Sequence, residues 1–146
     1  MSVPVDDPNS IVWRLRLSST PERVLSAWLT PADHARFWAE RSEPHAEGFR
    51  LHFIDGTVEL CRILDRVGPS HIRMLYFGSR VDITLSRLDN VTDLTLTARD
   101  VPVVEWQDVY AGWLSVLLPF KAWVDFGIDI RNHDAARTWR QRYVDQ

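Results

Sequence analysis

The chain has 146 residues, of which 45% are hydrophobic and 25% are charged, and its formal net charge is -3 at pH 7. This length and composition predict a single globular domain and argue against a disordered chain. The acidic balance, without any basic stretch, argues against nucleic acid or an anionic membrane surface as a partner, and no apolar stretch is long enough to cross a bilayer.

The numbers of tryptophans and cysteines indicate what kind of interior the domain has and which cross-links it lacks. Seven tryptophans are many for a chain of this length and predict a large aromatic interior or a cavity. Cys61 is the single cysteine, so neither an internal disulfide nor a cysteine-based zinc site is expected, and a reducing cytoplasm is the simplest location. The N-terminal residues do not follow the pattern of a secretory signal.

The N-terminal part of the chain predicts one strand and two short helices. Residues 1–9 are rich in proline and aspartate and are expected to form a loose leader, whereas residues 11–17 alternate as a half-buried strand does. Thr20-Pro21 and Thr30-Pro31 each supply a capping hydroxyl followed by a proline that suits the first helical position. Two such starts so close together predict two short helices in a V.

Alternation of apolar and polar residues predicts the central strands. Residues 41–47 are polar and include Pro44, so they are expected to form a loop. From Gly48 onward, five alternating stretches are bounded by turn sequences such as Asp55-Gly56. These stretches cover residues 48–53, 57–67, 71–77, 81–86 and 94–99. The connections are too short for parallel crossovers, so the strands are expected to be antiparallel neighbours.

The longest periodic segment, residues 106–127, predicts one long C-terminal helix. Its large apolar residues recur at three- and four-residue steps and therefore share one side. Pro119 inside the segment predicts a kink, and Gly127 is expected to end the helix. The order of elements predicts an α+β fold, in which a curved antiparallel sheet of about six strands grips the long helix.

Several short motifs occur in the order seen in a known family. They are Ser19-Thr20-Pro21-Glu22-Arg23-Val24, Trp28-Leu29-Thr30-Pro31, Phe37-Trp38, Gly48-Phe49, Asp55-Gly56 and Gly112-Trp113, spread over residues 10–127. The chain thereby resembles the START and Bet v 1-like (SRPBCC) superfamily, and within it the bacterial relatives of the C-terminal domain of the Hsp90 ATPase activator. The resemblance implies a helix-grip fold with an apolar cavity between the sheet and the long helix. Some superfamily members bind lipids, hormones or polyketides, and a minority catalyse reactions.

The candidate ligand-binding residues are large side chains expected to face the interior. They are Trp38, Phe53, Met74, Tyr76, Trp106, Tyr110, Trp113 and Leu117. Aromatic rings with a few polar tips are usual in a small-molecule site, although such rings are more often packed core. Arg62 is added because it points inward if Val58 and Leu60 do, and there it would meet an acidic ligand group. The alternative for Arg62 is a bulge, or an internal pair with neighbours such as Glu59 or Asp82.

The sequence assigns no catalytic residue, metal site or cofactor. The five histidines are scattered, and Cys61 has no evident basic neighbour that would activate its thiol. Asp125, Asp129 and His133 recur at four-residue steps, as metal ligands on a helix can, but Gly127 is expected to interrupt that helix.

The tail, residues 128–146, has two interpretations. The favoured one is a turn and a short helix that place Trp139 and Tyr143 on the surface of the domain. The alternative is a lid over one mouth of the cavity.

Three functions are compatible with this pattern. The leading hypothesis is a cytoplasmic, non-enzymatic protein that binds an apolar or aromatic small molecule, or a lipid, between the sheet and the long helix. The alternatives are a cyclase- or hydrolase-like enzyme that uses the same cavity, and a cochaperone-like protein-interaction module. Homodimerisation through the outer sheet or the tail is a further hypothesis.

Overall fold

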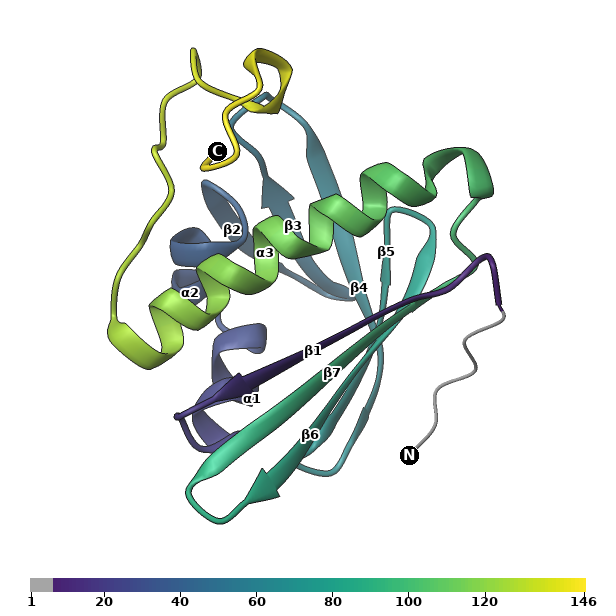
Figure 1. Cartoon of the computed structure of the whole chain (residues 1–146), viewed down its shortest axis with the longest axis vertical. Coiled ribbons are helices and arrows are strands. Elements are labelled where there is room, and N and C mark those ends of the chain that lie inside the picture. Colours follow the sequence, from purple (N-terminus) through teal and green to yellow (C-terminus); the bar gives the residue numbers. More distant parts are fainter. Residues whose placement is uncertain (1–6) are drawn as a thin grey trace.

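The computed structural model describes residues 7–146, so most of the expected leader at residues 1–9 lies outside the described part of the chain. The described residues form a seven-stranded antiparallel sheet and three α-helices (Figure 1). In spatial order, the strands are β1 (Ile11–Leu17), β7 (Val91–Arg99), β6 (Ser79–Leu88), β5 (His71–Tyr76), β4 (Val58–Val67), β3 (Gly48–His52) and β2 (Arg41–His45). The α+β helix-grip architecture expected from the sequence is confirmed.

Strands β2 to β7 pair consecutively as a meander, and β1 joins at the far edge. It pairs with β7 over its whole length, from Ile11 opposite Ala98 to Leu17 opposite Thr92. The edges of the sheet are therefore β1 and β2, which the two short helices separate in the sequence. Figure 1 shows α3 (Trp106–Phe126) crossing in front of the curved sheet.

The expectation of a loop at residues 41–47 is wrong, because Arg41–His45 forms strand β2. This strand pairs with β3 along its length and lies at the edge of the sheet. Proline lacks a backbone N–H but is accepted in an edge strand, where one side needs no partner. The proline led us to expect a loop where the chain forms a strand. The sheet therefore has seven strands where about six were expected.

Both short helices begin at the predicted prolines, as α1 (Pro21–Leu29) and α2 (Pro31–Phe37). Thr20 caps α1, because its hydroxyl oxygen accepts the backbone N–H of Arg23 at 3.2 Å. Thr30 does not cap α2 in the same way. Its hydroxyl donates instead to the carbonyl oxygen of Ser26 at 2.6 Å, and so binds the end of α1.

The long helix α3 ends as predicted. Gly127 follows it in the left-handed conformation, with φ of 67°, and donates its N–H to the carbonyl oxygen of Trp123. Pro119 lies buried inside the helix, and the expected kink there stays a prediction. Within the described residues, no helix has the length and apolar character needed to cross a membrane.

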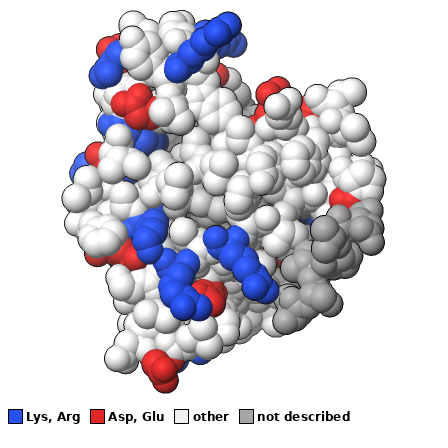
Figure 2. All heavy atoms as spheres, in the orientation of Figure 1, with Lys and Arg blue, Asp and Glu red and all other residues white. Residues whose placement is uncertain are grey.

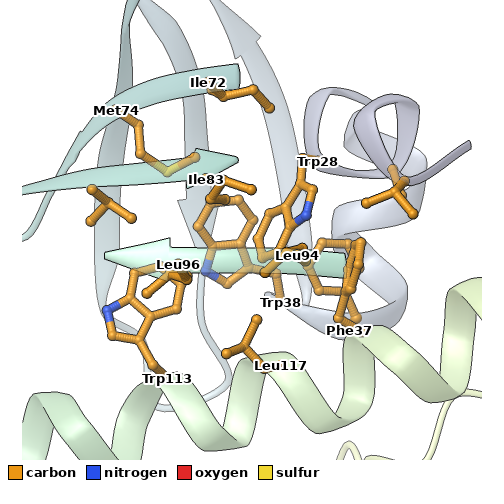
Figure 3. Packing of buried hydrophobic residues seen from close by; sticks show 14 of the residues in the cluster. Trp28, Phe37, Trp38, Ile72, Met74, Ile83, Leu94, Leu96, Trp113 and Leu117 are labelled. Carbon is orange, nitrogen blue, oxygen red and sulfur yellow. The ribbon is translucent and has the colours of Figure 1, made fainter. Parts of the chain in front are cut away.

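The core fills the space between the sheet and the helices. Figure 3 shows Trp113 and Leu117 extending from α3 toward Trp38 and Leu96. Deeper in the core, the ring of Trp28 stacks on that of Phe120 with 4.5 Å between their centroids. Full burial of an apolar side chain of this kind contributes about 1.5–3 kcal/mol. The aromatic helix expected from the sequence is thus covered by the sheet.

Candidate functional site

A pocket of about 580 Å³ opens where the N-terminal half of α3 meets two strand turns and the tail. Helix α3 contributes Asp108, Val109, Gly112, Trp113, Ser115 and Val116; the turns contribute Phe53, Asp55, Thr57, Tyr76, Phe77 and Ser79; and the rest of the lining is Phe37, Trp38, Arg131, Trp139 and Gln146. The volume lies within the range that is usual for small-molecule sites.

Three aromatic rings from separate elements form one wall of the pocket. Trp38 is the C-cap of α2, Tyr76 ends β5, and Trp113 lies on the buried face of α3. The ring of Tyr76 lies 5.3 Å from that of Trp38 and 5.3 Å from that of Trp113, between centroids. Rings packed against one another in this way keep a fixed arrangement, so the wall is largely formed before any ligand enters.

The phenol of Tyr76 is the central polar group of this wall. Its oxygen accepts a hydrogen bond from the indole Nε1–H of Trp38 at 3.1 Å. Burial raises the pKa of Tyr76, so the phenol keeps its proton at physiological pH. Among the described residues, the Tyr76 hydroxyl is hydrogen-bonded only to Trp38, as the acceptor, so its own proton has no partner there. The phenol can therefore donate to a molecule in the pocket.

The other pocket hydroxyls with hydrogen bonds use their protons within the protein. Ser79 donates to the carbonyl oxygen of Arg99 at 2.6 Å, and Ser115 donates to that of Gly112 at 2.8 Å. The Tyr76 proton therefore differs from theirs, since it remains available to a guest molecule.

Arg131 fastens the tail beside the pocket. Its side chain is only 6% exposed, and its Nη2 and Nη1 donate to the carbonyl oxygens of Ala35 at 2.7 Å and Ala39 at 3.1 Å. The carboxylate of Asp129 lies 3.4 Å from its Nε. A buried guanidinium needs partners of this kind, so the charge of Arg131 holds the tail on α2.

The structure divides the candidate ligand-binding residues into three groups. Trp38, Phe53, Tyr76 and Trp113 line the pocket, and ligand contact by them stays a prediction. Met74 and Leu117 are buried in the core outside the pocket lining. Trp106 and Tyr110 stack on each other with 4.6 Å between centroids, and Tyr110 packs on Trp13 of β1.

The expected inward orientation of Arg62 is wrong. Its side chain is 50% exposed, with its Nε 3.4 Å from a carboxylate oxygen of Glu47. The inward position belongs to Cys61, which is fully buried and pairs with Phe49 of β3, whereas Val58 is half exposed. The buried face of β4 is thus the one that carries Cys61, whereas the inward orientation of Arg62 required the face of Val58 and Leu60 to be buried. Burial raises the pKa of the Cys61 thiol to about 12, which leaves it unreactive at neutral pH.

Trp139 is the most informative pocket residue that the sequence did not assign to the site. It follows the extended part of the tail, begins a short 3-10 helix (Trp139–Gln141) and lines the pocket. Its ring faces Gly112, where an added Cβ would lie 3.6 Å from the ring, an ordinary contact distance. Both interpretations of the tail stay predictions.

The histidines lie outside the pocket lining. His34 is buried between α2 and β2, and His71 bonds to Asp82 on the outer face of the sheet, with 2.8 Å between Nε2 and Oδ1. The described lining therefore offers no imidazole as a general base.

The four-residue spacing in the tail does not make a metal site. Asp125 accepts the backbone N–H groups of Ser18 and Ser19, at 2.9 Å and 3.1 Å, and Gly127 separates it from the following residues. Asp129 and His133 bond to each other, with 2.7 Å between Oδ2 and Nε2. Across residues 7–146, no group of three or more His, Cys, Asp or Glu side chains is placed to share a metal ion.

Comparison with known proteins identifies the fold. No family model matches the sequence, and no curated protein matches it. Among solved structures, the chain is similar to protein SSP2350 from Staphylococcus saprophyticus, with a TM-score of 0.72, 19% identity, and coverage of 84% of this chain and 96% of that one. It is also similar to the Aha1 dimer from Colwellia psychrerythraea, with a TM-score of 0.71, 15% identity, and coverage of 81% of this chain and 97% of that one.

A third similar structure is DynU16, a protein in the dynemicin biosynthetic locus, with a TM-score of 0.73 and 18% identity. The match covers 86% of this chain and 50% of DynU16. At these identities the likeness shows a shared fold.

Proposed function

We propose that the protein binds a flat aromatic molecule in the pocket between α3, the strand turns and the tail. The observation that carries this proposal is the Tyr76 phenol, whose proton has no acceptor among the described residues although Trp38 fixes its oxygen. A buried donor of this kind is stabilised when a guest supplies the acceptor.

The lining defines the chemistry of the guest. Trp38 and Trp113 offer ring faces and edges, so a planar aromatic body gains contacts that an equally large aliphatic chain does not. The Tyr76 phenol calls for an acceptor on that body, such as a ketone or quinone oxygen. The guanidinium of Arg131 is engaged by α2 and Asp129, so the proposed ligand needs no negative charge.

Two fluorescent probes of similar shape test this proposal. One is 6-propionyl-2-(dimethylamino)naphthalene, an aromatic ketone, and the other is N-phenyl-1-naphthylamine, which has no oxygen acceptor. Both are expected to bind the wild type. Tyr76→Phe is expected to weaken the ketone about fivefold, which corresponds to about 1 kcal/mol for one hydrogen bond, and to leave the amine nearly unchanged.

Tyr110→Phe is the matched control, because Tyr110 lies outside the pocket lining and packs on Trp13 and Trp106. It is expected to leave both affinities unchanged. Absence of probe binding to the wild type contradicts the proposal, as does an equal effect of the two tyrosine variants on the ketone.

The cyclase- or hydrolase-like alternative needs a nucleophile or base beside the Tyr76 phenol. The described lining contains no histidine, and the thiol of Cys61 has a pKa of about 12 and lies outside the lining. The carboxylates of Asp55 and Asp108 do line the pocket, and they are the groups through which this alternative would have to act.

Self-association is a second candidate, supported by exposed apolar side chains around the end of α3. Leu118, Phe126, Ile128 and Ile130 are each between 48% and 66% exposed. Figure 2 shows that much of the face crossed by α3 carries neither acidic nor basic side chains. A structural neighbour is described as a dimer. We propose a homodimer through this surface, in which case Phe126→Ser converts a dimer into a monomer in light scattering, whereas a monomeric wild type contradicts it.

Membership in the family of Hsp90 ATPase activator relatives is likewise a proposal. It is supported by the ordered motifs from Ser19 to Trp113 and by the structural likeness to Aha1. A cytoplasmic location belongs to the same proposal, supported by the single free cysteine, Cys61.

A further inference from the structure

The end of the chain forms a loop that is closed on itself, here called the tail loop (residues 132–146). Asn132 joins its two ends, because its backbone N–H donates to the carbonyl oxygen of Asp145 at 2.8 Å and its amide donates to the Asp145 carboxylate at 3.0 Å. Inside the loop, Thr138 and Gln141 form a capping box, and the N–H of Trp139 donates to the side chain of Gln146 at 2.9 Å. The bonds within residues 134–146 favour movement of that segment as one body.

The tail loop is fastened to the rest of the protein at its beginning. Arg131 bonds to the carbonyl oxygens of Ala35 in α2 and of Ala39 just after it, and His133 Nδ1 lies 2.7 Å from a carboxylate oxygen of Glu40. After His133, the loop is no longer held by polar contacts to the rest of the described chain. Among the described residues, no hydrogen bond or ion pair joins residues 134–146 to residues 7–131.

Packing at the pocket takes the place of polar bonds. Trp139 lines the pocket and faces Gly112 of α3, and its side chain is 39% exposed overall. Gln146 also lines the pocket. Packing contacts can be lost and regained without leaving buried polar groups unpaired, so separation here costs less than breaking a hydrogen-bonded joint.

The backbone between the fastening and the loop is unusual. His133 has φ of 54°, in the left-handed region that non-glycine residues seldom adopt. His133 is a suitable pivot for residues 134–146, because a change of its backbone angles relieves strain while it swings that segment away from Asn132. The two bonds between Asn132 and Asp145 then act as a latch that parts on opening.

We propose that residues 134–146 form a hinged lid over the pocket, with the pivot at His133, a latch between Asn132 and Asp145, and Trp139 as the part that closes on α3. The inference rests on the proposed function, because a lid matters only if the pocket takes a guest. In the closed state Trp139 covers the guest, and in the open state residues 134–146 lift as a body, the bonds between Asn132 and Asp145 part, and Arg131 stays fastened to Ala35 of α2.

The test is the association rate of N-phenyl-1-naphthylamine in stopped-flow fluorescence. Trp139→Ala is expected to raise this rate about tenfold, because the probe no longer waits for the lid to open. Tyr143→Ala is the control in the same loop, since Tyr143 lies outside the pocket lining, and its rate is expected to match the wild type. Trp139→Phe is expected to fall between the two.

The outcomes separate the lid from the binding function. If the wild type takes up no probe, the proposed function fails and the lid with it. If the wild type binds the probe and Trp139→Ala associates at the wild-type rate, the lid alone is overturned.

Hydrogen exchange distinguishes hinged movement from unfolding of the loop. In Trp139→Ala, the backbone amides of Gln141 and Tyr143, which are bonded within residues 134–146, are expected to keep their protection, whereas the amide of Asn132, bonded to Asp145, is expected to exchange faster. Loss of protection at Gln141 and Tyr143 shows that the segment unfolds and overturns the hinge.

Discussion

His34 is fully buried between α2 and β2, and both of its ring nitrogens are used. Its Nε2 lies 2.7 Å from the carbonyl oxygen of Trp28, which only accepts, so Nε2 carries the proton. Nδ1 then accepts the hydroxyl proton of Ser42 at 2.9 Å. Burial lowers the pKa of His34 to about 4, because the charged ring would lose its solvation.

This environment makes the stability of the protein depend on pH. Unfolded His34 binds a proton below its ordinary pKa of 6.5, whereas native His34 stays neutral down to about 4, so the free energy of unfolding falls as the pH drops through this window. The loss between pH 7.5 and 5 is expected to be about 2 kcal/mol. Urea unfolding of the wild type and of His34→Gln checks it. An equal pH-dependent loss in both proteins would assign the effect to other groups.

Residue orientation was the least predictable property of the strands. In β4 both faces carry apolar residues, since Val58 and Leu60 alternate with Cys61 and Ile63, and the pattern alone does not say which face is buried. Pairing with β3, whose Leu51 lies in the core, places Cys61 inside and Arg62 outside. The pairing of β4 with β3 therefore decides which face of β4 is buried.

Two glycines in different elements make a matched comparison. Gly112 lies inside α3, where a new Cβ would meet only the Trp139 ring at 3.6 Å, an ordinary contact distance. Gly112→Ala is expected to raise the free energy of unfolding by about 0.5–1 kcal/mol, because alanine favours the helix more than glycine does. Gly48 lies in β3 with φ of 155°, and a Cβ there would lie 2.1 Å from the carbonyl oxygen of Cys61.

Gly48→Ala is therefore expected to lower the free energy of unfolding by about 2 kcal/mol or more, because the strand must move away from β4. Thermal and urea unfolding of both variants measure the two effects. Changes of the same sign in the two variants would contradict this account of the two elements.

The elements that the sequence predicts best are those with local signals. Helices α1 and α2 begin at threonine–proline pairs, and α3 ends at Gly127, because capping and backbone freedom act over a few residues. Strand β2 was missed because Pro44 and its polar neighbours resemble a loop, and its assignment depends on a place at the edge of the sheet. Whether a strand lies at the edge depends on the order of strands in the whole sheet, so the sequence of the strand alone does not indicate it.

At the scale of the molecule, the pocket was only partly predictable. Trp38, Tyr76 and Trp113 were recognised because large rings on inward positions converge in this fold. Trp106 and Tyr110 share the same helical side, but Tyr110 packs on Trp13 of β1 and Trp106 stacks on Tyr110. Which rings line a pocket and which fill the core depends on the curvature of the sheet.

The position of the tail loop could not be derived from periodicity either. Trp139 reaches α3 only because Arg131 fastens the extended segment to α2 and Asn132 closes the loop. These contacts join residues far apart in the sequence. The lid therefore stays a proposal, and it rests on contacts that periodicity does not predict.

Native mass spectrometry of the protein incubated with the aromatic ketone tests the pocket most directly. Ser115→Trp fills the pocket from α3, whereas Leu118→Trp places the same ring on the same helix at a position that is 56% exposed. We predict one ketone molecule on the wild type and on Leu118→Trp, lost on denaturation, and none on Ser115→Trp. A wild-type protein without the adduct, or an equal adduct on Ser115→Trp, would contradict binding in this pocket.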